Sequence, residues 1–428
     1  MKRKSRVQQV FVEPKLLLRK VYRIEPCQPN KRREAFSGRK KDGSFVLNRL
    51  CSFSYLRFLP VLMLLMCWGS LSNAQNFLRS TPFVSGKGYP YYRTPAIVKA
   101  GDGALLAFAE ARSAREDDSE GDIVLRRSMD NGYNWEVQQV IAGQDRSQRF
   151  GIPIPIVSDG KIILLYTRSR YVERQTDRGC RSILMKTSID NGKNWSSARD
   201  ITQQVSLPCR EDRNGRVANP IPAGSWGWLG LGPGHGIVKK QSPNKGRILA
   251  CARRNDNSGP NSYVIYSDDG GSNWRFGSTI NQKSSECTLA ELPNGDVMLN
   301  ARVVGQSSRL VAVSRNGGAS FGDVRLDPRL PEPLGGCAGS SLRYNNSILF
   351  SNPANRNDKT DGTLRRSTDN GLNWPISKRY TKNGEFSAYS DLVRINNGVG
   401  VLLEWGRSLS KPHEEIQFLV IPAGELGL

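Results

Sequence analysis

Short apolar runs separated by turn residues recur from about residue 80 to the C-terminus. Five of them start at a glycine, continue through apolar residues and end at an arginine: GALLAFAEAR, GKIILLYTR, GRILACAR, GDVMLNAR and GVGVLLEWGR. Runs of this length, rich in Val, Ile and Leu and bounded by Gly, predict β-strands. If they are the inner strands of blades around a common axis, their arginines converge at one end of a central channel. The alternative is that each arginine ends its strand in solvent.

An eight-residue pattern follows several strand-like segments. It occurs as SMDNGYNW at Ser128, SIDNGKNW at Ser188, SDDGGSNW at Ser267 and STDNGLNW at Ser367, with a degenerate copy, SRNGGASF, at Ser314. The Asp can accept backbone N–H groups within a turn, the Gly supplies a positive φ, and the Trp can pack back onto the sheet. The pattern therefore predicts a hairpin staple. Spacings of 60, 79, 47 and 53 residues between copies suit four-stranded blades with loops of variable length.

The positive charge is concentrated at the N-terminus. Of the net +23, residues 1–74 contribute +12, from 16 Lys/Arg and 4 Asp/Glu, and the remainder contributes +11. The run RFLPVLMLLMCWG from Arg57 has the length of a signal peptide and is too short to span a bilayer, and Ser72 and Ala74 fit cleavage after Ala74. We therefore predict a basic leader and signal peptide over residues 1–74 and a mature, exported chain over 75–428, either secreted or periplasmic. A buried core helix is the alternative for the apolar run.

Two questions about the N-terminal region follow from this division. Residues 1–45 are either an extended leader or the product of a misplaced upstream start codon, and the sequence does not separate the two. Nucleic-acid binding is not expected, because the most basic segment is absent from the predicted mature chain and no nucleic-acid motif is present. We expect no stable membrane span in the mature chain.

The cysteine and histidine content excludes several kinds of site. Five cysteines follow residue 74: Cys180, Cys209, Cys251, Cys287 and Cys337. An odd, scattered set is not a disulfide framework, so the choice is between one bridge, Cys180 to Cys209, and buried free thiols. There is no C-x-x-C pair and only two histidines, His235 and His413, which we expect in loops or on the surface. A zinc site or a Ser-His-Asp machine is therefore not supported.

These motifs resemble the sialidase (neuraminidase) family with Asp-box, or BNR, repeats, including its bacterial and lysosomal members. The octapeptide is similar to the Asp-box, and YYRTPAIV at Tyr91 resembles the family's first-arginine motif. The likeness continues in the family's order through LLAFAEAR, IVLRRSMDNG, GPGHGI, ECTLAELPNGDVMLNAR, LFSNPA and TLRRSTDNG to YSDL, over about residues 80–428. It implies an all-β, six-bladed β-propeller after the N-terminal leader. Five boxes, with one blade closed by the two chain ends, account for six blades.

The resemblance implies a cluster of substrate-binding arginines. Three arginines hold the carboxylate of the sugar in this family, and the matching positions are Arg93 in YRTP, Arg302 in LNAR and Arg365 in TLRR. A planar guanidinium binds a carboxylate in bidentate fashion, and an anionic ligand relieves the repulsion among gathered cations. Arg112 in EAR matches a further arginine that contacts the ring hydroxyls. Thr94 replaces the family's usual Ile, which could alter how that strand packs.

The resemblance also implies a tyrosine nucleophile with a glutamate partner. The matching residues are Tyr389 in SAYSDL and Glu286 in SSECTLAEL; Glu291, the nearby alternative, is predicted to end a strand. The anomeric carbon of a sialic acid carries a carboxylate, which would repel an anionic nucleophile but not a neutral phenol. Because a phenol has a pKa of about 10, a carboxylate must take its proton. Glu286 is suited to that role.

The acid/base is expected on the loop SAREDDSEGD, where two aspartates compete. Counting forward from Arg93 favours Asp118, and counting backward from Ile123 favours Asp117. The residue must be protonated to assist departure of the leaving group and ionised to activate water afterwards. We expect the neighbouring acids of the loop to raise its pKa.

Taken together, the resemblance implies an exported exo-α-sialidase. It would remove terminal sialic acids from sialylated glycans or glycolipids, with retention, through a Tyr-linked glycosyl-enzyme intermediate, without a metal or cofactor and as a monomer. Two alternatives stay open. One is a catalytically silent Asp-box propeller that binds carbohydrate, which loss of Tyr389, Glu286 or the loop aspartate would mark, and none of these is lost. The other is a propeller glycosidase acting on another sugar, for which carboxylate-binding arginines would be unnecessary.

Overall fold

The computed structural model describes residues 77–117, 119–145, 147–170, 179–280 and 282–428. The leader and signal peptide predicted over residues 1–74, and Asp118, lie outside the described residues. The chain divides into two units, Met1–Ser72 and Asn73–Leu428, and the second contains the described residues. None of the helices in those residues is both long and apolar enough to cross a membrane.

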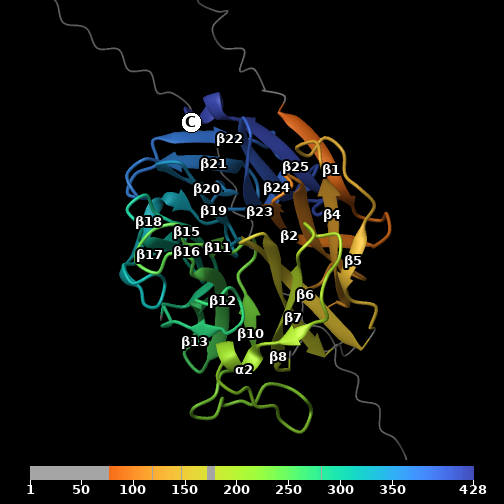
Figure 1. Ribbon diagram of the computed structural model, residues 1–428, viewed down its shortest axis with the longest axis vertical. Helices are drawn as coiled ribbons and strands as arrows, with labels where there is room; N and C mark the ends of the chain where they lie inside the picture. The colour runs from red at the N-terminus through yellow and green to blue at the C-terminus, as the bar shows by residue number, and fades with distance from the viewer. Residues whose placement is uncertain (1–76, 118, 146, 171–178, 281) are drawn as a thin grey trace, which may run out of the picture. The chain divides into compact units, whose positions relative to one another are not determined.

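The described unit is a six-bladed β-propeller, as the resemblance implied (Figure 1). The first three blades in chain order are β2 (Tyr91–Lys99), β3 (Leu105–Arg112), β4 (Gly121–Ser128) and β5 (Gln139–Ala142); β6 (Gln148–Ser158), β7 (Lys161–Arg170), β8 (Arg181–Ser188) and β9 (Arg199–Asp200); and β10 (Leu229–Leu231), β11 (Ile237–Val238), β12 (Ile248–Asp256), β13 (Gly259–Ser267) and β14 (Arg275–Phe276).

The second half of the chain forms the other three blades. They are β15 (Ser284–Glu291), β16 (Val297–Val303), β17 (Ser308–Ser314) and β18 (Gly322–Pro331); β19 (Ser340–Tyr344), β20 (Ser347–Pro353), β21 (Gly362–Ser367) and β22 (Ile376–Arg379); and β23 (Phe386–Ile395), β24 (Gly398–Gly406) and β25 (Glu415–Pro422) with β1 (Leu78–Val84). Two short helices, α2 (Thr202–Val205) and η1 (Ala423–Leu426), complete the described elements.

The two ends of the propeller close one blade together. Strand β1, from the N-terminal end of the described chain, pairs antiparallel with β25 from the C-terminal end, so the sixth sheet has the order β1-β25-β24-β23. This arrangement confirms the expectation of five boxes and one closing blade. It ties the first described strand of the propeller to the last one by antiparallel pairing.

Each Asp-box joins the third and fourth strands of its blade, as a hairpin staple should. In the second blade, Ser188 Oγ donates to Asp190 Oδ1 at 2.8 Å, and the same oxygen accepts the N–H of Asn194 at 2.9 Å. The N–H of Gly192, at φ +83°, donates to Ser188 Oγ at 2.8 Å. The degenerate copy at Ser314 keeps this geometry, with Asn316 in place of the aspartate. The box is therefore a local turn structure, which the sequence predicted correctly.

The prediction that the Gly-to-Arg runs are inner strands is wrong. They form β3, β7, β12, β16 and β24, the second strand of each of five blades, whereas the first strands contact one another around the axis. An antiparallel second strand ends where the first strand begins, so Arg112 lies opposite Tyr91 in the sheet register. Of the five terminal arginines, Arg112 and Arg253 line the central cavity, and Arg302 contacts Glu286 at its wall. Arg168 and Arg407 instead pair with exposed or half-buried acids at the periphery.

Irregular pairing marks four of the inner strands: β6, between Gly151 and Ile154, and three strands that carry predicted site residues. The register shifts between Arg93 and Ala96 in β2, between Ser284 and Cys287 in β15, and between Ser387 and Ser390 in β23. A β-bulge places two residues opposite one and re-aims the side chains beside it. These three irregularities flank Arg93, Glu286 and Tyr389, so they lie where the strands turn functional side chains toward the cavity.

Four of the five described cysteines form disulfides. Cys180 is bonded to Cys209, which was one of the two alternatives from the sequence, and Cys251 is bonded to Cys287. Cys337 is free and fully buried. It packs with Phe386 and Ala388 against the ring of Tyr389.

Candidate active site

A cavity at the end of the channel where β2 begins collects polar side chains from five blades. It is lined by Arg93, Thr94, Glu110, Arg112, Asp117, Arg149, Ile152, Arg181, Pro233, Arg253, Glu286 and Tyr389. Five residues that the sequence analysis singled out are in this set: Arg93, Arg112, Asp117, Glu286 and Tyr389. They come from β2, β3, the loop after β3, β15 and β23, so only the closed propeller brings them together.

Tyr389 and Glu286 form the shortest polar contact at this cavity. The phenol Oη of Tyr389 donates to Glu286 Oε1 at 2.5 Å, and Glu286 is only 3% exposed. Two guanidiniums flank the carboxylate: Arg302 Nη1 lies 2.9 Å from Oε2, and Arg253 Nη1 lies 3.6 Å from Oε1. Burial raises the pKa of Glu286, but Arg253 and Arg302 outweigh burial and leave the pKa below its ordinary value. Glu286 is therefore ionised at neutral pH and can accept a proton.

The environment keeps the phenol of Tyr389 neutral. Burial raises the pKa of Tyr389 well above its ordinary value, and the negative charge of Glu286 raises this pKa further. A neutral phenol is not repelled by an anionic substrate, but it needs a base as its oxygen attacks. The hydrogen bond to Glu286 provides a direct path for that proton.

Arg93 is fixed by a buried glutamate from the sixth blade. Its Nε donates to Glu404 Oε1 at 3.0 Å, and the N–H of Thr94 donates to the same oxygen at 2.7 Å. Thr94 has φ +53°, an unfavourable conformation for a β-branched residue, which the bulge and this hydrogen bond hold in place. Glu404 is fully buried, and Arg93 lowers its pKa against the opposing effect of burial. The guanidinium of Arg93 is thus oriented before any ligand arrives.

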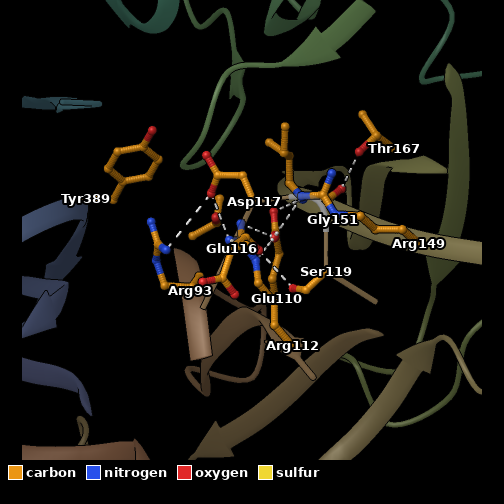
Figure 2. A network of polar contacts seen from close by, with 12 residues as sticks. Arg93, Glu110, Arg112, Glu116, Asp117, Ser119, Arg149, Gly151, Thr167 and Tyr389 are labelled. Atoms are coloured by element: carbon orange, nitrogen blue, oxygen red, sulfur yellow. Dashed lines mark hydrogen bonds and ion pairs between the residues drawn. The ribbon is translucent and has the colours of Figure 1, made fainter. Parts of the chain in front are cut away.

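Asp117 is bound to the arginines of the first blade (Figure 2). Its Oδ1 lies 2.9 Å from Arg112 Nη1 and 4.0 Å from Arg93 Nη1. Arg112 is also paired with buried Glu110, whose Oε2 is 2.6 Å from Arg112 Nη2 and 3.6 Å from Arg149 Nη2. Figure 2 shows Tyr389, Arg93 and Asp117 bordering one space.

The expectation that neighbouring acids raise the pKa of the loop acid is wrong for Asp117. Burial does raise its pKa, but the ion pair with Arg112 and the nearby charges of Arg93 and Arg149 lower it below the ordinary value. The physical reason is that cations, and not the other loop acids, are the closest charges to this carboxylate. Its side chain is 62% exposed, so solvent screens these charges in part.

Of the predicted arginines, Arg93 and Arg112 line the cavity and Arg302 contacts Glu286 at its wall, whereas Arg365 is not among the lining residues. Its Nη1 donates to Asn352 Oδ1 at 2.9 Å, and it has no carboxylate partner among the described residues. Burial lowers the pKa of Arg365 to about 10. Lys359, a cation that the sequence analysis did not single out, lies beside the strand that carries Tyr389, because its carbonyl accepts the N–H of Ser387 at 2.8 Å.

Both histidines lie in loops, as expected, but their side chains are largely buried and not on the surface. His235 Nδ1 lies 2.7 Å from Asp391 Oδ1, an oxygen that also accepts Ser340 Oγ at 2.7 Å. Burial lowers the pKa of His235, but Asp391 outweighs it and the pKa lies above its ordinary value. His413 Nδ1 lies 3.1 Å from Glu404 Oε2. Each ring is therefore held against a buried carboxylate of the propeller.

Sequence reasoning missed the glutamates that support the site arginines. Glu110 and Glu404 are fully buried, and each stands inside an apolar strand run, AFAEAR and LLEWGR. A carboxylate in the middle of an apolar strand needs a cationic or hydrogen-bonding partner. A glutamate inside an otherwise apolar run was therefore the sequence feature that could have identified these residues. Arg253 ended one of the recurring runs but was not assigned a role. Within the described ranges, no group of three or more His, Cys, Asp or Glu side chains is placed to hold a metal ion.

The chain is similar to known proteins over most of the propeller. Residues 103–401 match the family model described as a BNR repeat-like domain. A sialidase of Micromonospora viridifaciens is 32% identical over 76% of this chain, which spans about half (52%) of that protein. Sialidase-2 of Cricetulus griseus is 27% identical over 77% of this chain and 91% of its own length.

The fold likeness extends to solved structures. A Hadza microbial sialidase superimposes with a TM-score of 0.69 at 23% identity, over 82% of this chain and 69% of that one. At this identity the likeness establishes the shared propeller. With the family model and the curated relatives, it shows that the chain belongs to the sialidase family with BNR repeats.

Proposed function

We propose that this protein is a retaining exo-α-sialidase that removes terminal sialic acid from glycoconjugates. The observation that carries the proposal is the 2.5 Å hydrogen bond from the buried Tyr389 phenol to ionised Glu286, beside the preset guanidiniums of Arg93 and Arg302. Family membership supports the substrate class, since the curated relatives are named sialidases. The two arginines would bind the carboxylate on the anomeric carbon and so place that carbon against the phenol oxygen.

In the first step, Tyr389 Oη bonds to the anomeric carbon as the bond from that carbon to the glycosidic oxygen breaks. Glu286 takes the phenol proton, and the loop acid gives a proton to the departing oxygen, which leaves as an alcohol. The neutral phenol suits this step because the substrate carboxylate would repel an anionic nucleophile. The product is a sialyl-tyrosine intermediate.

In the second step, water replaces the tyrosine at the anomeric carbon. The loop carboxylate takes a proton from the water as its oxygen bonds to carbon, and Glu286 returns its proton to the departing Tyr389 oxygen. Both groups end in their starting protonation states. Two displacements at one carbon give overall retention of configuration.

We assign the acid/base role to Asp117, with Asp118 as the alternative. Asp117 lines the cavity, within 4.0 Å of Arg93 and hydrogen-bonded to Arg112. Because cations lower its pKa, Asp117 is ionised in the free protein at neutral pH. A bound carboxylate on Arg93 would place a negative charge near Asp117 and oppose the field of that guanidinium. We therefore expect the pKa of Asp117 to rise when substrate binds, which prepares the acid for the first step.

The test is hydrolysis of a 4-methylumbelliferyl sialoside by the purified chain, with Tyr389→Phe beside it. We expect activity that is lost in Tyr389→Phe, and the α anomer as the first product seen by proton NMR. A 2,3-difluoro sialic acid, which slows breakdown of the intermediate, should label Tyr389 in a peptide mass analysis. First release of the β anomer would refute retention, and a folded chain that cleaves no sialoside would refute the sialidase proposal.

The choice between Asp117 and Asp118 has its own readout. An acid that protonates the leaving group matters most for a poor leaving group. The alanine variant of the true acid should lose cleavage of sialyllactose far more than cleavage of the umbelliferyl substrate, and the other variant should lose both equally or not at all.

We also propose that the mature chain is exported. The apolar run from Arg57, with small residues at Ser72 and Ala74, supports a cleaved signal peptide. The Cys180–Cys209 disulfide supports an oxidising compartment. N-terminal sequencing of the protein recovered outside the cytoplasm should start at Gln75, and an intact N-terminus on the recovered protein would refute cleavage there.

A further inference from the structure

We propose that a buried ion pair outside the cavity, Arg309 with Glu332, positions Arg302 for the substrate through the loop of residues 333–336. The inference rests on the proposed function, because it assigns the pair to the binding of a sialic acid carboxylate. Neither residue is exposed: the relative accessibility of each is 0%. They cannot touch a substrate, and we assign them as positioning residues.

The pair fixes the backbone of Cys337, where the loop ends. Arg309 Nη1 donates to Glu332 Oε2 and to the carbonyl oxygen of Cys337, each at 2.6 Å. The N–H of Cys337 donates to Glu332 Oε1, also at 2.6 Å. On its other side, Arg309 Nε donates to Asn300 Oδ1 at 2.7 Å, two residues before Arg302 on β16. One guanidinium thus links the strand that carries Arg302 to the end of the loop.

The loop lies directly against the Arg302 side chain. The N–H of Gly336 donates to the carbonyl of Pro333 at 2.8 Å, and Gly335 and Gly336 have φ of +79° and +74°. The carbonyl of Gly335 accepts a hydrogen bond from Arg302 Nη2. A methyl group on Gly336 would collide with Arg302 Nε. The two glycines therefore let the backbone approach the guanidinium closely.

Arg302 is held between two supports. Glu286 binds its Nη1 at 2.9 Å from the cavity side, and the carbonyl of Gly335 binds its Nη2 from the loop side. If the loop shifts, Arg302 keeps only the Glu286 contact, and Glu286 must also serve Tyr389. The predicted consequence is weaker binding of carboxylate ligands with a smaller effect on the chemical step.

A buried ion pair is a poor source of stability compared with apolar side chains of similar volume. The double variant Arg309→Met/Glu332→Leu should therefore fold with little change in melting temperature while the loop loses its anchor. A matched control is Lys239→Met/Glu291→Leu. This second buried pair, with its atoms 3.1 Å apart, lies outside the cavity lining.

The experiment measures KM and kcat on the umbelliferyl sialoside and the dissociation constant of 2-deoxy-2,3-dehydro-N-acetylneuraminic acid by calorimetry. For Arg309→Met/Glu332→Leu we expect KM and the dissociation constant to rise roughly 10-fold, with kcat within about 3-fold of wild type. In an Arg302→Ala background the same double change should add less than about 2-fold to KM. The control pair should leave KM unchanged. A folded variant with unchanged KM, or an equal rise without Arg302, would overturn the proposal.

Substitution in the loop gives a second approach. Gly336→Ala should raise KM roughly 10-fold, because the new methyl displaces Arg302, whereas Gly305→Ala carries similar strain at φ +76° with no atom in its path and should leave KM within about 2-fold. A wild-type chain that neither cleaves nor binds sialic acid ligands would refute the proposed function. Crystal structures would then decide the positioning role: an Arg302 side chain displaced in the double variant supports it, and an unmoved Arg302 overturns it.

Discussion

The substitution Glu286→Gln removes one charge from the site and keeps the shape of the side chain. In the structure Glu286 accepts the Tyr389 phenol at 2.5 Å and is flanked by Arg302 at 2.9 Å and Arg253 at 3.6 Å. A glutamine can still accept the phenol hydrogen bond but cannot take the proton. General base catalysis contributes about 10²–10⁴-fold. At 1.36 kcal/mol per factor of ten, we expect kcat to fall by an amount equal to about 3–5 kcal/mol in the barrier.

The same substitution should also destabilise the fold. Removing one partner of a buried ion pair costs about 3–5 kcal/mol, because two guanidiniums lose their shared carboxylate. We therefore expect a lower melting temperature together with the loss of kcat. Kinetics must be measured at a temperature where circular dichroism shows the variant to be folded, so that loss of catalysis is not confused with unfolding.

Glu291→Gln is the matched control. Glu291 lies on the same strand, β15, is also buried, and contacts Lys239 at 3.1 Å and Arg343 at 3.4 Å, outside the cavity lining. It should lose stability by a similar mechanism and keep kcat within about 3-fold of wild type. A folded Glu286→Gln protein with kcat within about 10-fold of wild type would refute the role of Glu286 as the base, as would an equal loss of kcat in Glu291→Gln.

Three other predictions follow from the structure. In Arg112→Met, the fall of kcat/KM with rising pH should begin at a higher pH than in the wild type. The reason is that loss of the guanidinium raises the pKa of Asp117, so the acid stays protonated to a higher pH. An unchanged pH dependence of kcat/KM would contradict Asp117 as the acid. Arg365→Met should leave KM within about 2-fold of wild type and the melting temperature unchanged or higher, because this buried cation has no carboxylate partner in the described chain. A rise in KM of about 10-fold would instead support Arg365 as a ligand of the substrate carboxylate. Cys180→Ala/Cys209→Ala should lower the free energy of unfolding by about 3–4 kcal/mol, from loop-closure entropy over a sequence separation of 29, with kcat unchanged; an unchanged denaturant midpoint would contradict it.

Local chemistry explains why the blades could be predicted from the sequence. The Asp-box is complete within eight residues: Ser188, Asp190 and Gly192 bind one another and close the turn without help from the rest of the chain. A repeated local unit therefore appears directly in the sequence, with its spacing. The closing blade was predicted differently: the family resemblance implied six blades, and the five boxes left one blade to be closed by the chain ends.

The site could be predicted only in part, because its partners are distant in sequence. Tyr389 and Glu286 are 103 residues apart, and it was the family resemblance, not any local pattern, that paired them. The bulges at Arg93, Glu286 and Tyr389 break the strict alternation on which strand reasoning depends. At the bulge beside Arg93, for example, the guanidinium is held by Glu404 of another blade, a contact that a single sequence does not display.

The charges of the site arginines are balanced in a way that the sequence analysis did not predict. Gathered arginines were expected to repel one another until an anionic ligand arrived. In the structure four arginines that line the cavity or support it are paired with glutamates: Arg93–Glu404 at 3.0 Å, Arg112–Glu110 at 2.6 Å, Arg302–Glu286 at 2.9 Å and Arg309–Glu332 at 2.6 Å. The glutamates compensate the charge and fix the guanidinium planes before binding, at the expense of burying ions.

This pairing distinguishes these four arginines from Arg365, which has no glutamate partner among the described residues and whose pKa is lowered by burial. A guanidinium that must bind a carboxylate in one orientation gains from a buried acid on its far side, because the acid holds the side chain while the near side stays open to the ligand. Glu404 does this for Arg93, whereas Glu286 contacts Arg302 from the cavity side and also accepts the hydrogen bond of the Tyr389 phenol. In the proposed mechanism, substrate binding and activation of the nucleophile share this one carboxylate. Any change that turns Arg302 away should then alter the basicity of Glu286 as well as the affinity for the sugar.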